Sequence, residues 1–181
     1  VVKFLRLLSS PEGINLSLRH VSLSTCGIVD HIYQLAELHL GLTLSVSLHA
    51  PNDRLRSETM PVNRRYPLDT LLEACRYYAD VTHRRISFEY ALIQGVNDSE
   101  QCARELASRL QGMLCHVNLI PVNQVDERSY RASGKAFIYN FQKTLTDFGI
   151  NATVRRTLGA DINAACGQLR RSQCKKNEVS L

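Results

Sequence analysis

The sequence predicts an α/β fold in which strands and helices alternate along the chain and the strands form a parallel sheet. Two observations predict it. Segments that alternate apolar and polar residues recur, and the stretches between them have a helical period and the length of a helix rather than of a hairpin turn. Such a series folds most readily into parallel strands joined by right-handed crossovers. The 181 residues, 44% of them hydrophobic, suffice for one sizeable core.

Five segments have the two-residue period of a strand: 19–24, 43–49, 86–93, 116–120 and 152–156. The helical patterns between them consist of Ile32, Leu35 and Leu38; Leu68, Leu71, Leu72, Cys75 and Ala79; Cys102, Leu106 and Leu110; and Ile138, Phe141, Leu145 and Phe148. Asp30 and Asp98 suit helix N-caps, and Gly41 and Gly149 suit the position after a last helical turn.

An apolar helical pattern containing Leu5 and Leu8 opens the chain at Val1, with no methionine or cap residue ahead of it. We therefore expect the chain to be part of a longer protein, truncated at its N-terminus. Residues 1–168 are expected to form the barrel portion described next, and the basic residues in 169–181 predict a frayed tail.

The predicted strands each carry one polar side, whereas parallel strands buried on both faces are nearly continuous apolar runs. These polar positions are Ser45, Ser47 and His49; Ser87 and Glu89; His116 and Asn118; and Thr153 and Arg155. If the apolar sides meet the helices, the polar sides line the interior of a partial, TIM-like (βα) barrel and hold a polar ligand near the carboxyl ends of the strands. An antiparallel sheet with one solvated face would alternate similarly, but the helix-length connections disfavour it.

Composition narrows the class of protein. A formal net charge of +5 favours an anionic partner. The six cysteines lack any Cys-x-x-Cys pair or zinc-like spacing with histidine, so no metal site is predicted and the thiols are typical of a reduced, cytoplasmic protein. No apolar run approaches the ~20 residues that cross a bilayer, and no signal peptide opens the chain. We expect a monomer without membrane contact.

Four predicted strand ends carry polar residues on tight loops, at 24–27, 47–53, 94–98 and 121–123. Taken singly, each is more often a turn or a helix cap, and Asn97 with Asp98 is interpreted as a cap. Together on one rim they indicate a ligand site.

Cys166 lies between Ala165 and Gly167, downstream of the cationic pair Arg155 and Arg156. An open thiol near cations is placed to ionise and to react. A lone cysteine in a cytosolic protein is more often a small buried apolar residue, so the local sequence leaves both roles open.

Seven strings occur in order along nearly the whole chain: LSTCGIV at 23–29, SLHAPND at 47–53, MPVN at 60–63, FEYALI at 88–93, GVND at 95–98, NLIP at 118–121 and AACGQL at 164–169. Together they resemble the radical-SAM RNA adenine methyltransferases of the RlmN/Cfr type. The resemblance implies a partial barrel of radical-SAM type that binds S-adenosylmethionine (SAM) and methylates an adenine carbon of large-subunit ribosomal RNA, with tRNA as a second candidate substrate.

The resemblance also implies roles for particular residues. Cys166 matches the cysteine that receives a methyl group from one SAM, after which a radical made from a second SAM at a 4Fe-4S cluster activates that methyl group for addition to adenine. Ser24, the turn formed by Ser47, Leu48 and His49, and Asn123 match positions that contact SAM. The resemblance implies that cofactor chemistry activates the methyl group for addition to an unreactive adenine carbon, and that the protein positions the reacting groups.

The chain lacks the family's cluster-binding Cys-x-x-x-Cys-x-x-Cys, its Gly-Glu motif, its accessory domain and its second, resolving cysteine. We expect these in the parent protein and predict that the chain alone is inactive. Two other hypotheses stay open. One is a TIM-barrel-like enzyme in which Cys166 is a nucleophile with His49 or His116 as its base. The other is an RNA-binding module without catalysis, supported only by paired arginines.

Overall fold

The computed structural model describes residues 1–122 and 130–155. Its centre is a five-stranded sheet in the order β1-β2-β3-β4-β5, and neighbouring strands pair in parallel throughout. The strands are β1 (Ser22–Thr25), β2 (Thr43–Ser47), β3 (Ile86–Leu92), β4 (Cys115–Pro121) and β5 (Ala152–Val154). Sequential order with parallel pairing is the arrangement of a (βα) barrel. The predicted parallel sheet is confirmed, and the antiparallel alternative is wrong.

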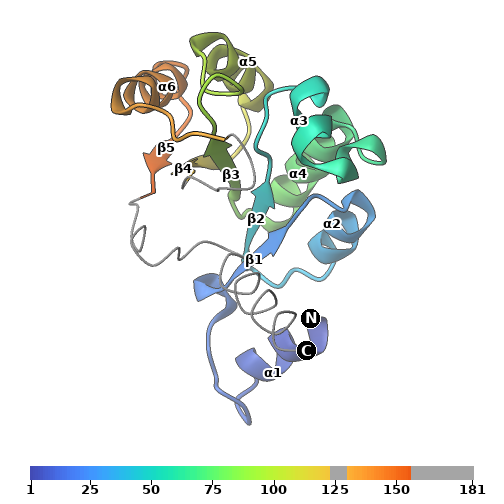
Figure 1. Ribbon diagram of the computed structural model, residues 1–181. Coiled ribbons are helices and arrows are strands. Elements are labelled where there is room, and N and C mark those ends of the chain that lie inside the picture. Colours follow the sequence, from blue (N-terminus) through green and yellow to red (C-terminus); the bar gives the residue numbers. More distant parts are fainter. Residues whose placement is uncertain (123–129, 156–181) are drawn as a thin grey trace, which may run out of the picture.

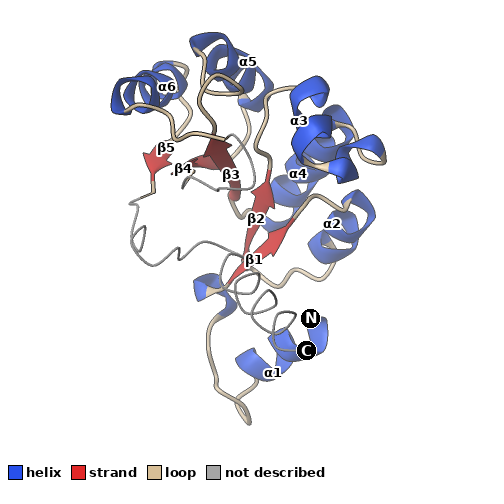
Figure 2. Cartoon of the chain, in the orientation of Figure 1, coloured by secondary structure: helices blue, strands red, loops and turns tan. Residues whose placement is uncertain are grey.

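Helices connect the strands and cover the outer side of the curved sheet (Figures 1 and 2). They are α1 (Val2–Ser9), α2 (Val29–Ala36), α3 (Asp53–Thr59), α4 (Leu68–Thr82), α5 (Glu100–Leu110) and α6 (Lys135–Asp147), with short 3₁₀ helices at Leu18–His20 and Pro61–Arg64. Helix α2 packs beside α4, and α5 packs beside α6. Helix α1 lies apart from this layer, beyond the amino end of β1 (Figure 1).

The two faces of the sheet differ as the alternation predicts. On the helix side Val46, Phe88 and Val117 are fully buried and form the centre of the core. On the other side the strand register aligns polar residues in rows, such as Ser47 with Glu89 and Glu89 with Asn118. The hydrophobic effect therefore turns the apolar face of the sheet towards the helices, and the polar face remains available for contacts with a ligand.

Local signals at the element ends were only partly correct. The N-cap of α2 is Ile28 rather than Asp30, and α5 is capped by Ser99, whose hydroxyl accepts the Cys102 N–H at 3.2 Å, rather than by Asp98. Gly41 does not follow the last turn of α2, which ends at Ala36. Gly149 does follow the last turn of α6, with φ +78° and its N–H donated to the Thr146 carbonyl.

Two further differences concern the loops. Residues 19 and 20 lie in a 3₁₀ turn before β1 rather than in the strand. Helix α3 was not predicted, because its sequence DRLRSET has one apolar residue, Leu55, and therefore no amphipathic period. Its local signals are Asn52, whose side chain caps the helix by accepting the Leu55 N–H at 3.0 Å, and the acidic Asp53 in the first turn.

Candidate functional site

The predicted contacts Ser24 and Ser47 lie near the carboxyl ends of two adjacent strands. Ser24 is exposed on the polar face of β1 and is in register with Ser45 of β2. Ser47 is the half-buried last residue of β2 and is in register with Glu89. The structure therefore brings together residues that are far apart in the sequence at one edge of the sheet, where parallel α/β folds bind their ligands.

Leu48 contributes to this edge only through its backbone. Its side chain is fully buried in the core, and its N–H donates to the Glu89 carbonyl at 3.0 Å. Any contact of Leu48 with a ligand at the polar face is thus restricted to its carbonyl. Burial of this side chain also anchors the turn between Ser47 and His49.

His49 follows in a left-handed conformation, with φ +57°. Its Nδ1 accepts the Ala91 N–H at 3.0 Å, which connects the turn after β2 to strand β3. Burial, and then the nearby Arg56 cation, lowers the pKa of His49 to about 4. The ring is therefore neutral at pH 7. With Nδ1 as an acceptor, Nε2 carries the proton and is the donor that remains for a ligand.

Asn97 holds the same turn from the loop after β3. Its side chain donates to the carbonyls of His49 at 2.8 Å and Ala91 at 2.7 Å, and accepts the Ile93 N–H at 2.7 Å. It is buried, and its own carbonyl accepts the Tyr90 hydroxyl. The interpretation of Asn97 as a helix cap is therefore wrong. Asp98 does stay local, since it accepts the Gly95 N–H.

Glu89 lies half-buried on the polar face. It accepts hydrogen bonds from Asn118 at 2.8 Å and from Ser87 at 3.3 Å. Among residues 1–122 and 130–155 it has no ion-pair partner. Such a carboxylate is suited to accept donors of a ligand. The sequence analysis placed Glu89 in the interior without assigning it a contact, because its environment depends on the neighbouring strands.

His116 lies farther from the carboxyl edge of the same face. It shares a hydrogen bond of 3.0 Å between its Nε2 and the Thr153 hydroxyl. Burial first, then Arg85, lowers its pKa, while Glu89 acts in the opposite direction. His116 lies in the row of Ser87, and Thr153 lies in the neighbouring row of Glu89 and Asn118.

The two other predicted site residues, Asn123 and Cys166, lie outside the described residues, as does the expected tail 169–181. Their roles stay predictions. The four described cysteines are Cys26, which is exposed, and Cys75, Cys102 and Cys115, which are buried. Burial raises the pKa of Cys75 to about 12 and that of Cys115 to about 11, so both are inert thiols at neutral pH.

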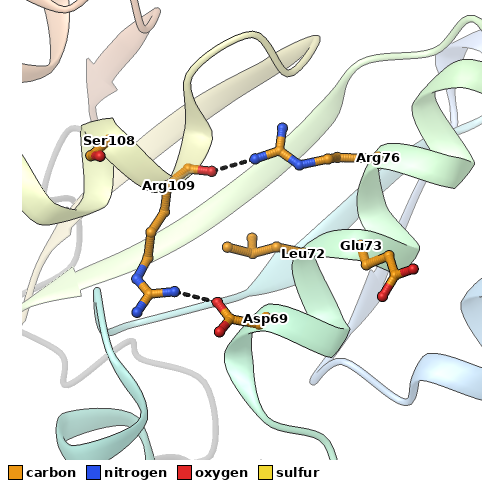
Figure 3. Close-up of a pocket in the computed structure, with 6 residues that line it drawn as sticks. All are labelled: Asp69, Leu72, Glu73, Arg76, Ser108 and Arg109. Atoms are coloured by element: carbon orange, nitrogen blue, oxygen red, sulfur yellow. Dashed lines mark hydrogen bonds and ion pairs between the residues drawn. The ribbon is translucent and has the colours of Figure 1, made fainter.

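Two cavities lie elsewhere. One, of about 360 Å³, opens between α4 and α5 and is lined by Asp69, Arg76 and Arg109 among others (Figure 3). The other, of about 400 Å³, lies beside α6 and the end of β5 and includes Ser133 and Arg155. Neither includes Ser24, Ser47 or His49. The candidate site is thus the open polar face and its carboxyl edge.

Within the described ranges, no group of three or more His, Cys, Asp or Glu side chains could hold a metal ion. None of the helices in that part of the chain is both long and apolar enough to cross a membrane.

Comparison with known proteins identifies relatives of this chain. No family model matches it. It is 56% identical over 170 residues to a protein of Alkaliphilus oremlandii named "Probable dual-specificity RNA methyltransferase RlmN", covering 94% of this chain and 50% of that protein. A protein of the same name from Clostridium tetani is 53% identical over 180 residues, covering 99% of this chain and 52% of the relative. The chain therefore spans about half the length of the curated relatives it matches.

Comparison with solved structures agrees with the sequence relatives. A radical SAM methyltransferase from Sphaerobacter thermophilus superposes with a TM-score of 0.88 at 48% identity, covering 92% of this chain and 49% of that one. A domain of pyruvate-formate lyase-activating enzyme from Bacteroides vulgatus shares the fold alone, with a TM-score of 0.61 at 19% identity. The predicted resemblance is confirmed: over nearly its whole length this chain is homologous to the RlmN-type radical SAM RNA methyltransferases, of which it spans about half.

Proposed function

We propose that this chain forms the SAM-binding barrel portion of an enzyme that methylates an adenine carbon in RNA. The observation that carries the proposal is the turn after β2. It presents Ser47 and a neutral His49 at the carboxyl edge of the polar face, and Asn97 holds it in place. Homology to proteins named RNA methyltransferases supports the reaction class.

The chemistry of the polar face fits SAM. The face offers hydroxyl groups, the His49 donor and the carboxylate of Glu89, which has no cationic partner among the described residues. SAM carries ribose hydroxyls together with ammonium and sulfonium charges, and would supply the methyl group. Ser24, Ser47 and His49 would orient it, with the Leu48 carbonyl as a backbone acceptor. Asn123 is the fifth proposed contact.

A 4Fe-4S cluster does not fit the described residues. Three of their four thiols are buried, and no set of three metal ligands comes together. We therefore assign no step of this chain to a cluster. The proposal for the parent enzyme is that cluster ligands come from residues outside this chain, and that the chain alone does not turn over.

Cys166 is the proposed methyl carrier, with large-subunit ribosomal RNA as the substrate and tRNA as a second one. The alternative in which Cys166 is a nucleophile with His49 as its base is disfavoured, because an imidazole with a pKa of about 4 accepts a proton weakly at neutral pH. An RNA-binding module without catalysis would not require Ser47 and His49 to be placed together at the carboxyl edge for contact with SAM.

The experiment uses a chimera in which this chain replaces the matching 180 residues of the Clostridium tetani relative. We expect the chimera, reconstituted without oxygen, to methylate ribosomal RNA, and Cys166→Ala to abolish the product. Cys115→Ala is the matched control, because Cys115 is buried at the amino end of β4, away from the carboxyl edge of the sheet. Mass spectrometry of the Cys166 peptide should show a methyl group. An inactive chimera beside an active relative, or activity in Cys166→Ala, would overturn the proposal.

A further inference from the structure

Arg56 of α3 is a fully buried cation, with an exposed fraction of 0%. In the described part of the chain, no carboxylate lies within ion-pair distance of its guanidinium. Burial of a charge without an ion pair is unfavourable unless neutral acceptors surround it. The position of those acceptors therefore indicates what the residue does.

The acceptors come from both strand ends of the candidate site. Arg56 Nη2 donates to the carbonyl of Cys26, just after β1, at 2.9 Å and to the carbonyl of Ser47, at the end of β2, at 3.4 Å. Arg56 Nη1 donates to the Asn63 side chain at 2.8 Å. One guanidinium thus joins the end of the strand that carries Ser24 to the turn that carries His49.

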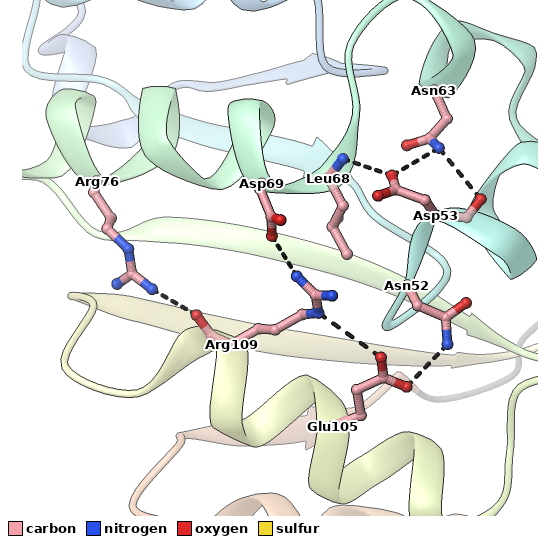
Figure 4. A network of polar contacts seen from close by, with 8 residues as sticks. All are labelled: Asn52, Asp53, Asn63, Leu68, Asp69, Arg76, Glu105 and Arg109. Atoms are coloured by element: carbon pink, nitrogen blue, oxygen red, sulfur yellow. Dashed lines mark hydrogen bonds and ion pairs between the residues drawn. The ribbon is translucent and has the colours of Figure 1, made fainter.

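Asn63 keeps the guanidinium in this orientation. It is buried, and its amide donates to the Asp53 carboxylate and to the Ser57 hydroxyl, both at 2.9 Å. The Asp53 carboxylate also accepts a hydrogen bond from the Leu68 N–H, at the start of α4 (Figure 4). The Arg56 guanidinium is therefore oriented by hydrogen bonds from the segment between β2 and α4, and not only by its own aliphatic side chain.

Gly27 shows that the loop after β1 is shaped around the same group. Its φ is +98°, and a Cβ at this position would lie 3.2 Å from Arg56 Nη2 and 3.0 Å from the Leu71 methyl groups. Only glycine allows both this backbone conformation and this approach. The close packing is an independent sign that the distance between the Cys26 carbonyl and Arg56 is specified.

We propose that Arg56 is a positioning residue of the cofactor site, which sets the ends of β1 and β2 relative to each other and thereby places Ser24 beside the turn of Ser47 and His49. The inference rests on the proposed function, in which these residues contact SAM. Arg56 itself is fully buried and acts through the carbonyls of Cys26 and Ser47.

The first measurement does not involve SAM. Residual dipolar couplings of the Cys26 and Leu48 amides in the 181-residue chain report how the two strand ends are oriented. We expect Arg56→Lys to change them, because an ammonium cannot span the three acceptors in the same plane. Arg54→Lys is the matched control on the same helix, since the Arg54 side chain is 75% exposed and, within residues 1–122 and 130–155, pairs only with Glu58.

The second measurement is the dissociation constant of SAM by calorimetry with the chimera described above. We expect Arg56→Lys to weaken binding about tenfold, as loss of an outer hydrogen-bond partner does in metal sites, and Arg54→Lys to leave it unchanged. Asn63→Ala, which frees the guanidinium but keeps the charge, should weaken binding in the same direction. If Arg56→Lys does not fold, the SAM affinity of Asn63→Ala tests the proposal in its place.

The outcomes separate the two proposals. If the unsubstituted chimera does not bind SAM, the proposed function fails, and the dipolar couplings still decide whether Arg56 positions the strand ends. If the chimera binds SAM and folded Arg56→Lys and Asn63→Ala bind it equally well, with unchanged couplings, the positioning role is wrong.

Discussion

The molecule contains two neighbouring polar networks, and the Asn52 amide, which donates to Glu105 at 2.9 Å, lies between them (Figure 4). The rim network, at the carboxyl ends of β1 to β3, consists of His49, Arg56, Asn63 and Asn97. The helix-surface network, between α4 and α5, consists of Asp69, Arg76, Glu105 and Arg109 (Figure 4). They differ in exposure and in the groups they bond.

The rim network bonds mainly to backbone groups and is buried, so each lost partner leaves an unsatisfied group away from water. In the helix-surface network, Arg109 pairs with Asp69, whose side chain is 82% exposed, and with Glu105 at 3.9 Å. Water and salt screen such pairs. The comparison teaches that polar contacts determine position where they are buried and bonded to the backbone, whatever their formal charge.

The largest effect is expected for Asn97→Ala. The substitution leaves the Ile93 N–H and the carbonyls of His49 and Ala91 without their partner, which should lower the free energy of unfolding by about 4 kcal/mol. Urea unfolding followed by circular dichroism measures it. Asn140→Ala, on the exposed side of α6, is the control. A loss below that of the control would show that burial does not distinguish the rim network.

The second effect is a pH dependence. Because folding lowers the pKa of His49 from 6.5 to about 4, the unfolded chain binds more protons between these values. The stabilisation is therefore complete above pH 6.5 and decreases as the pH falls towards 4, by on the order of 3 kcal/mol. Urea unfolding from pH 7.5 to pH 4 measures this decrease. His49→Gln should remove that component, and an identical pH dependence in the variant would contradict the assignment.

A smaller effect is expected for Gly27→Ala. A methyl group there would contact Arg56 and Leu71, and alanine disfavours the positive φ that Gly27 adopts, so we expect a loss of about 2 kcal/mol in thermal or urea unfolding. Gly112→Ala separates the two causes, because Gly112 also has a positive φ of +74° but nothing within 4 Å of its Cβ position. Equal losses in both variants would mean that the contact with the rim network contributes nothing.

The smallest effect is expected in the helix-surface network. Asp69→Ala removes the partner of Arg109 on an exposed helix and should change the free energy of unfolding by less than about 0.5 kcal/mol. The difference from the unsubstituted chain should shrink further in 1 M NaCl, because salt screens exposed charges. A loss comparable to that of Asn97→Ala, insensitive to salt, would remove the distinction between the two networks.

The sequence alone determined the order of the strands and of the helices other than α3, the parallel sheet and its one polar face. These follow from local period and connection length, which neighbouring residues carry. It also placed Ser24, Ser47 and His49 at strand ends, and identified Gly149 at the end of α6, because a glycine after a helical pattern is a local signal.

Only the tertiary structure decided that α3 is a helix, that Arg56 is buried and that Asn97 is a bridge rather than a cap. The deciding contacts join residues distant in the sequence: Arg56 bonds a carbonyl 30 positions away, His49 an amide 42 away, and Asn97 a carbonyl 48 away. Residue types and local spacing do not specify such pairs. They arise because burial of the apolar faces brings the strand ends together and excludes the water that would otherwise satisfy these groups.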